Sequence, residues 1–178
     1  MKSVLLRYTC CMMVASCMSL QAEELGGWSI SQQVVDWIRA TLPRGSVILE
    51  CGSGYGSGIL SLYYEIHSIE HNSYWLGKYR GPHYIYAPIV DRWYDVERLK
   101  CELPSLTYNL ILVDGPNGEI GRKGFFENLD LFNVEGTIIV FDDIDRKAEF
   151  DLMMAVAHKL GRTPKKLVAD SSVGILMP

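Results

Sequence analysis

Ser46-Val47-Ile48-Leu49-Glu50-Cys51-Gly52-Ser53-Gly54-Tyr55-Gly56-Ser57-Gly58 is the stretch that decides the fold of this chain. Its apolar first part predicts a buried strand that ends at an acidic residue. The alternating glycines predict a sharp turn, because glycine adopts positive φ without a steric cost. The helix expected next directs its first N–H groups back at the turn. This stretch therefore predicts a cradle for a nucleotide-type ligand.

Strands and helices alternate on either side of this cradle. Residues 110–113 are all apolar, which indicates a strand buried on both faces of a parallel sheet. The pattern predicts an α/β fold, a Rossmann-like three-layer α/β/α sandwich with a mostly parallel seven-stranded sheet. The last two strands are too close for a crossover helix and predict a C-terminal antiparallel hairpin. Besides the first strand, the expected strands are 66–70, 83–89, 108–114, 136–141, 165–169 and 173–177.

The expected helices follow from apolar periodicity and from capping residues. The first begins at the capping-box pattern of residues 29–32 and ends before Pro43. Asn72 is expected to cap another helix that runs to about Tyr79. The remaining helices are predicted over residues 57–65, 95–103, 124–132 and 145–160.

Composition limits the classes of partner. The chain has 178 residues and a net charge of −4, with no run rich in Lys or Arg, so we expect no nucleic-acid partner. The five cysteines show no spacing typical of a zinc site. Cys51 and Cys101 lie in apolar-looking segments and are predicted to be reduced and buried.

Acidic and small residues occupy the carboxyl ends of the predicted strands, where open α/β sheets bind their ligands. This set is too acidic for a phosphate site and suits a ligand with hydroxyls, an amino group or a metal ion. Its members are Glu50, Gly52, Glu70, His71, Pro88, Asp114, Gly115, Asp142 and Asp143.

The spacing of the glycines argues against a dinucleotide. A dinucleotide-binding turn has the pattern G-x-G-x-x-G. Counted from Gly52 the sixth position is Ser57, and counted from Gly54 it is Ile59. An NAD(P)-binding oxidoreductase is therefore a disfavoured alternative.

The pattern E-x-G-x-G-x-G, here Glu50, Gly52, Gly54 and Gly56, resembles that of class I S-adenosylmethionine-dependent methyltransferases. The resemblance extends over nearly all of residues 26–178. Over this range the chain is similar to a small bacterial branch of the O-methyltransferase-like group. It is carried by residues 68–72, 87–89, 93–95, 113–116, 121–122 and 142–146, in that order.

This resemblance implies an enzyme that uses S-adenosylmethionine and methylates a hydroxyl of a small molecule or glycan. It implies that Glu70 accepts hydrogen bonds from the ribose hydroxyls. Trp93 and Tyr94 are candidates for an aromatic wall of the pocket, or else for the core. A non-catalytic module that binds S-adenosylmethionine is the alternative. The expected cosubstrate contacts are Glu50, Gly52, Ser53, Gly54, Gly56, Ser57, Glu70, His71, Pro88 and Asp114.

Three aspartates are expected on the acceptor side. Asp114, Asp142 and Asp143 resemble the metal ligands of catechol-type O-methyltransferases, although Asp143 stands where that family has Asn. A divalent cation such as Mg²⁺ is accordingly a candidate cofactor. Two alternatives stay open: that Asp142 or Asp143 caps the next helix and pairs with Arg122 or Arg146, and that Asp114 is a general base without metal.

The expected catalytic residues are Asp114, Asp143 and Arg122. Arg122 follows a glycine-rich loop and is expected either to bind an anionic acceptor or to form an ion pair at the surface.

Residues 1–24 are set apart from the domain expected over residues 25–178. Two basic residues precede a mostly apolar run over residues 8–20, which is the outline of a secretory signal. The run is too short for a stable membrane span. The other interpretation, which an intracellular cosubstrate favours, is a cytoplasmic protein whose translation starts at a later methionine.

Overall fold

The computed structural model describes residues 30–167 and 172–178. Its main sheet has seven strands in the order β3-β2-β1-β6-β7-β9-β8. All neighbouring strands are parallel except β9, which runs antiparallel to both β7 and β8. The predicted fold class, with its C-terminal hairpin, is thereby confirmed. The strands are β1 (Val47–Cys51), β2 (Glu65–Glu70), β3 (His83–Tyr86), β6 (Leu110–Val113), β7 (Ile138–Phe141), β8 (Pro164–Lys166) and β9 (Gly174–Leu176).

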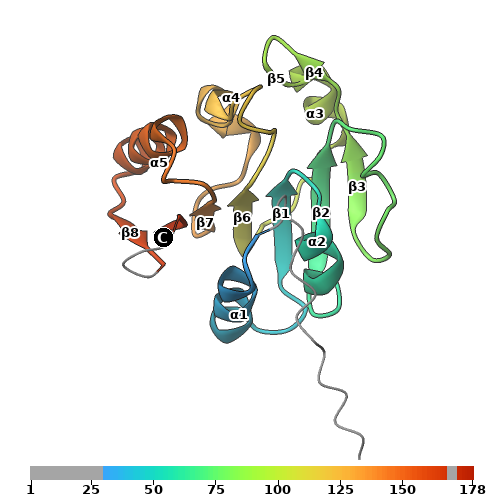
Figure 1. Cartoon of the computed structure of the whole chain (residues 1–178), viewed down its shortest axis with the longest axis horizontal. Helices are drawn as coiled ribbons and strands as arrows, with labels where there is room; N and C mark the ends of the chain where they lie inside the picture. Colours follow the sequence, from blue (N-terminus) through green and yellow to red (C-terminus); the bar gives the residue numbers. More distant parts are fainter. Residues whose placement is uncertain (1–29, 168–171) are drawn as a thin grey trace, which may run out of the picture.

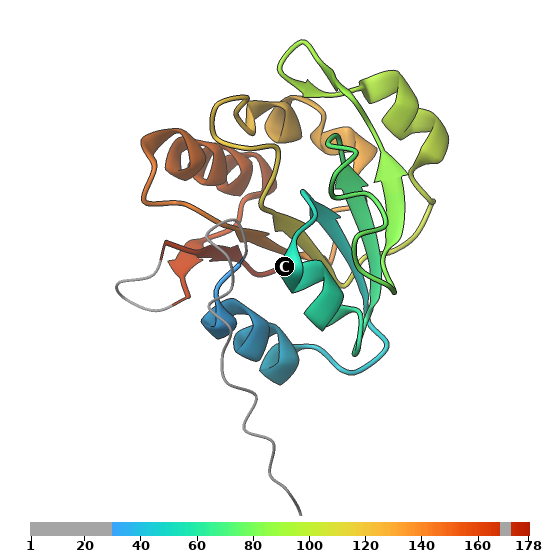
Figure 2. The same ribbon diagram turned by 45° about the vertical axis from the view of Figure 1, so that its right-hand side comes forward.

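Helices cover both faces of this sheet (Figures 1 and 2). α1 and α2 pack on one face, and α3, α4 and α5 pack on the other. In Figure 1 the arrowheads of β1, β2 and β6 point to the same edge of the sheet. The helices are α1 (Gln32–Thr41), α2 (Tyr55–Leu60), α3 (Val96–Glu102), α4 (Lys123–Glu127) and α5 (Lys147–Leu160), with a short 3₁₀ helix η1 (Leu129–Leu131).

Alternation along the strands fills two separate cores. In β1, Ile48 faces the core under α1 and α2, while Leu49 faces the core under the other helices. In β6, Leu112 and Ile111 divide in the same way. Successive side chains of a strand point to opposite faces. Both faces are buried, as the apolar run 110–113 predicts.

Four local predictions are wrong. The helix predicted over residues 57–65 ends at Leu60, and Glu65 already begins β2. Residues 72–79 form no helix: the Asn72 side chain accepts from the backbone N–H of Tyr74 (3.0 Å) as a helix cap does, but the chain turns over residues 73–77 and Gly77 has a φ of 70°, outside the helical range. The third strand ends at Tyr86, and a separate hairpin joins β4 (Ile89–Val90) to β5 (Trp93–Tyr94). Cys101 is exposed.

At the start of the described chain, Ser31 is the N-cap of α1, since its Oγ accepts from the N–H of Val34 (3.4 Å). The expected capping box starts at Ser29, which lies outside the described residues, as does the leader 1–24. Within residues 30–167 and 172–178, no helix combines the length and apolar character needed to span a membrane.

Candidate functional site

A cleft of about 380 Å³ lies at the carboxyl ends of the parallel strands. It brings together residues that follow β1, β2, β6 and β7, as expected for a sheet of this kind. The lining residues are Gly52, Ser53, Glu70, His71, Asn72, Trp75, Tyr94, Asp114, Gly115, Pro116, Asn117, Gly118, Arg122, Asp142, Asp143 and Arg146.

The glycine turn after β1 forms one wall of this cleft. Gly52 has a φ of 90°, and a Cβ placed on it would lie 3.0 Å from the Cα of Gly115. Only glycine fits there without displacing the loop after β6. Gly54 precedes α2, and its N–H donates to the Oγ of Ser57 (2.9 Å). The turn is thus held close to the neighbouring strand end.

Glu70 joins this turn to the loop after β2. Its side chain is 3% exposed and accepts from three backbone N–H groups: those of Ser53 (2.9 Å), His71 (2.7 Å) and Asn72 (2.6 Å). A carboxylate has about four acceptor positions, so most of its capacity is used within the protein. The predicted contact of Glu70 with ribose hydroxyls stays a prediction.

Glu50 lies beneath the turn, next to a second cavity of about 10 Å³. Burial raises the pKa of its carboxyl from 4.5 to about 7, while a hydrogen bond with Ser57 opposes the shift. Among the described residues, its Oε1 has no hydrogen-bond partner. Gly54 and Gly56 line this small cavity, and Gly52 and Asp114 line both cavities.

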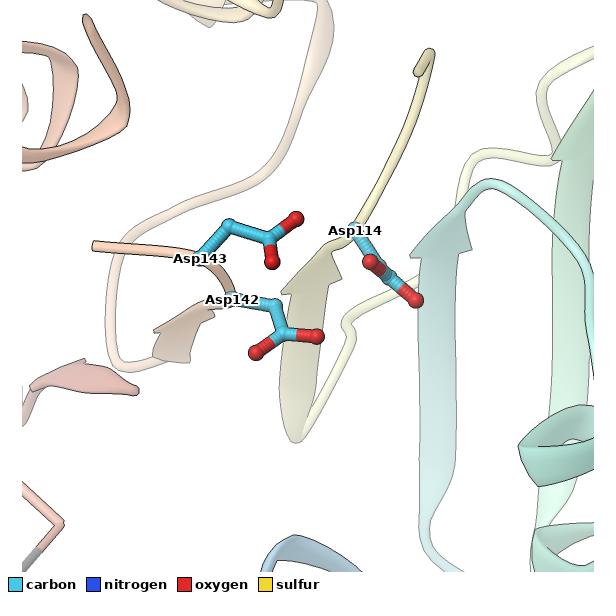
Figure 3. A group of neighbouring side chains, drawn as sticks. All are labelled: Asp114, Asp142 and Asp143. Carbon is cyan, nitrogen blue, oxygen red and sulfur yellow. The ribbon is translucent and has the colours of Figure 1, made fainter. Parts of the chain in front are cut away.

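Three carboxyl groups lie close together between the ends of β6 and β7 (Figure 3). Asp114 follows β6, Asp142 and Asp143 follow β7, and one oxygen of each lies within 4.8 Å of the others. Burial, followed by the charge of Asp142, raises the pKa of Asp114 well above its usual range. Burial, followed by the charge of Asp143, likewise raises the pKa of Asp142.

Arg122 extends inward beneath these acids and is 5% exposed. Its Nη2 donates to Asp114 Oδ1 (3.3 Å) and Asp143 Oδ2 (2.8 Å), and Arg146 Nη1 lies 3.0 Å from the same Asp143 oxygen. The ion pair between Arg122 and Asp143, one of the alternatives from the sequence, is therefore present, but it is buried and not at the surface. All five N–H donors of Arg122 bond to oxygen atoms of the protein, which does not fit the expectation that Arg122 binds an anionic methyl-acceptor substrate. The other acceptors are the carbonyl oxygens of Val113 (3.5 Å), Pro116 (3.2 Å) and Asp142 (2.9 Å).

Tyr94 and Trp75 complete the cleft. Tyr94 is fully buried, and its hydroxyl has no hydrogen-bond partner among the described residues. A Cβ on Gly115 would lie 2.6 Å from that hydroxyl. Trp75 was not predicted, because it falls in the segment expected to be helical. Its ring lies 4.0 Å from the Nζ of Lys78, a cation–π contact at the rim.

The other predicted residues divide between the cavities. Ser53 and His71 line the large cleft, whereas Gly56 and Ser57 line the small one. Pro88 lines neither, because the chain turns at this point into the β4–β5 hairpin. Trp93 packs in the core, so the two expected aromatic walls have different roles.

No protein-family model matches the chain, and no curated protein matches it in sequence. Solved structures do resemble its fold. The O-methyltransferase TomG from Streptomyces achromogenes, solved with S-adenosylmethionine, has 14% identity and a TM-score of 0.57 over 85% of this chain and 82% of its own. CalS11, a TDP-rhamnose 3'-O-methyltransferase, has 17% identity and a TM-score of 0.51 over 81% and 77%.

MycE, a methyltransferase of the mycinamycin pathway solved with Mg and S-adenosylhomocysteine, has 15% identity and a TM-score of 0.51. The match covers 81% of this chain and 44% of MycE. At such identities the likeness establishes the fold, which this chain shares with these methyltransferases.

Proposed function

We propose that the chain is an S-adenosylmethionine-dependent methyltransferase that transfers a methyl group to a hydroxyl of a small-molecule or glycan-type acceptor. The observation that carries this proposal is the cleft between the glycine turn and the acids at the ends of β2, β6 and β7. The fold likeness supports it, because TomG and CalS11 are named as O-methyltransferases. Function on a shared fold still depends on the site itself.

The residues of the cleft suit the cosubstrate. Gly52 and Gly115 let the turn after β1 pack directly against the loop after β6, because a Cβ on either would lie 3.0 Å or less from the backbone of the other, and both backbone segments border the cleft. The Tyr94 hydroxyl at the cleft and Glu50 Oε1 at the adjoining small cavity are buried polar atoms without partners in the described part of the chain. Unpaired buried polar groups are costly, which favours a ligand that completes their hydrogen bonds. S-adenosylmethionine offers an amino group, a carboxylate, ribose hydroxyls and adenine nitrogens.

We assign cosubstrate binding to the residues of the two cavities and not to Pro88. Glu70 holds the glycine turn in place through its bond from Ser53 N–H and presents its remaining acceptor capacity to the ligand. His71 and Trp75 border the same cleft and are suited to flank a flat ring.

Asp114 is the proposed general base. When bound, S-adenosylmethionine supplies an electrophilic methyl group. Asp114 would accept the proton of the acceptor hydroxyl as that oxygen bonds to the methyl carbon, while the bond from this carbon to sulfur breaks and S-adenosylhomocysteine is the leaving group. A carboxyl whose pKa is raised by burial is a stronger base than an exposed one. Asp143 and Arg122 position it, and the rest of catalysis is alignment of the two reacting groups.

A divalent cation such as Mg²⁺ is the second cofactor that the sequence suggests. The oxygens of Asp114, Asp142 and Asp143 are the ligand type that Mg²⁺ prefers, and MycE was solved with Mg. The guanidinium of Arg122, however, already lies between two of these carboxylates. No step of the proposed reaction depends on a metal ion.

Isothermal titration of the folded chain with S-adenosylmethionine tests this function. We expect one ligand per chain and methyl transfer to at least one hydroxyl compound in a broad acceptor panel. Binding without transfer to any acceptor would favour the non-catalytic module. Binding of NAD(P) in place of S-adenosylmethionine would overturn the proposal. An intracellular cosubstrate also favours a cytoplasmic location.

A further inference from the structure

We propose that Arg122 is the resident cation of the acidic cluster formed by Asp114, Asp142 and Asp143, and that it takes the place a divalent metal ion would need. Fold likeness to a Mg-containing methyltransferase suggests a metal at this cluster. The contacts of this chain instead indicate that its own guanidinium neutralises the acids. Asp114 is then positioned by a side chain and works without metal.

The first reason is that the Arg122 guanidinium already occupies the space between two of the carboxylates. Arg122 Nη2 lies 3.3 Å from Asp114 Oδ1 and 2.8 Å from Asp143 Oδ2, so it bridges two carboxylates of the cluster. Mg²⁺ binds oxygens at about 2.0–2.1 Å and demands near-octahedral geometry. An ion that contacted both oxygens would therefore lie against the guanidinium, which carries charge of the same sign.

The second reason is the state of the Asp143 carboxylate. Its Oδ2 accepts from Arg122 (2.8 Å) and also lies 3.0 Å from Arg146 Nη1. A carboxylate oxygen has two lone-pair sites, so these contacts use the sites that a metal would need on this atom. Asp143 also has a φ of 61°, a left-handed conformation that is uncommon for a residue other than glycine. This backbone conformation presents its side chain to the two arginines.

The third reason is that Arg122 is fixed. Its Nε and Nη1 donate to carbonyl oxygens from the loop after β6 and from the residue after β7, including Pro116 (3.2 Å) and Asp142 (2.9 Å). The residue is 5% exposed. Swinging it out to admit a metal would leave these buried carbonyls without their donor, which is unfavourable. By contrast, the Arg146 side chain is 51% exposed and is able to move.

Titration with Mn²⁺, followed by electron paramagnetic resonance of the free ion, tests this inference on the full chain. We expect the wild type to leave millimolar Mn²⁺ free. Arg122→Ala removes the resident cation and is expected to bind one Mn²⁺ at least tenfold more tightly than the wild type does. The matched control Arg146→Ala keeps Arg122 in place and is expected to exclude the ion as the wild type does.

Stoichiometric Mn²⁺ binding by the wild type, abolished in Asp114→Asn, would overturn the inference. The same conclusion would follow if a folded Arg122→Ala gained no affinity for Mn²⁺. Should Arg122→Ala fail to fold, the wild-type titration remains decisive, and Arg122→Lys, which keeps the charge, is expected to exclude the ion.

The expectation of a metal rests on the proposed methyltransferase function, but the titration measures the cluster itself. A chain that excludes Mn²⁺ and does not bind S-adenosylmethionine would refute the proposed function and leave the inference intact. A chain that binds both Mn²⁺ at the cluster and S-adenosylmethionine would refute the inference and leave the proposed function intact.

Discussion

Replacing Glu50 with glutamine is expected to stabilise the ligand-free protein at pH 8. Glu50 is 2% exposed, and burial raises the pKa of its carboxyl from 4.5 to about 7. Between these values the folded chain keeps a proton that the unfolded chain has released, so stability falls as pH rises. At about 1.4 kcal/mol per pKa unit, the full loss above pH 7 is about 3 kcal/mol. Glutamine carries no charge to desolvate and avoids this loss.

Urea unfolding of the two proteins from pH 4 to pH 8 measures the difference. We expect it to be smallest near pH 4 and to grow to about 3 kcal/mol at pH 8, or roughly 6–12 °C in Tm for a domain of this size. Glu97→Gln is the matched control, because the Glu97 side chain is 82% exposed, and it should show little change. A difference that stays constant with pH, or a variant less stable at pH 8, would refute the buried carboxyl as the cause.

Three further changes probe the cleft. Gly52→Ala is expected to lower the free energy of unfolding in urea by about 1–3 kcal/mol more than Gly45→Ala does. Both residues have positive φ, but of the two only Gly52 would bring a Cβ against backbone, 3.0 Å away. Equal losses in the two variants would contradict this crowding. Tyr94→Phe removes a hydroxyl without a partner among the described residues, so it should keep or raise the stability of the ligand-free chain. The same change should weaken S-adenosylhomocysteine binding by about tenfold. An unchanged affinity in calorimetry would exclude a contact between the Tyr94 hydroxyl and the ligand. Asp114→Asn should lower kcat by about 10²–10⁴, and full activity in a methyl-transfer assay would rule out the general base.

The fold could be predicted because its signals are local. The apolar run 110–113 is buried on both faces, and the glycines after β1 form the expected turn. The segment 72–79 could not be predicted in the same way, because an Asn side chain can begin either a helix or a turn. Cys101 was misplaced because α3 is amphipathic: Leu99 is buried, and a residue two positions further along a helix faces another direction.

The position of the candidate site at the carboxyl ends of the strands could be predicted from the sequence, but most of the contacts between its side chains could not. Glu70 and Asp114 line one cleft because parallel strands end at the same edge of the sheet. The burial of Arg122 depends on carbonyl oxygens of Pro116 and Asp142 that only the folded chain brings together. Trp75 enters the cleft because a turn, and not a helix, follows Glu70. Such contacts leave no periodic pattern in the sequence.

The most direct test of the central claim is a calorimetric titration of the full chain with S-adenosylhomocysteine, repeated with Gly52→Ala. We predict one site per chain for the wild type and markedly weaker binding for a folded Gly52→Ala, whose added Cβ would lie 3.0 Å from the Cα of Gly115 and would displace the glycine turn that borders the cleft. A wild-type chain that is folded but releases no heat of binding would contradict the claim that this cleft binds the methyltransferase cosubstrate.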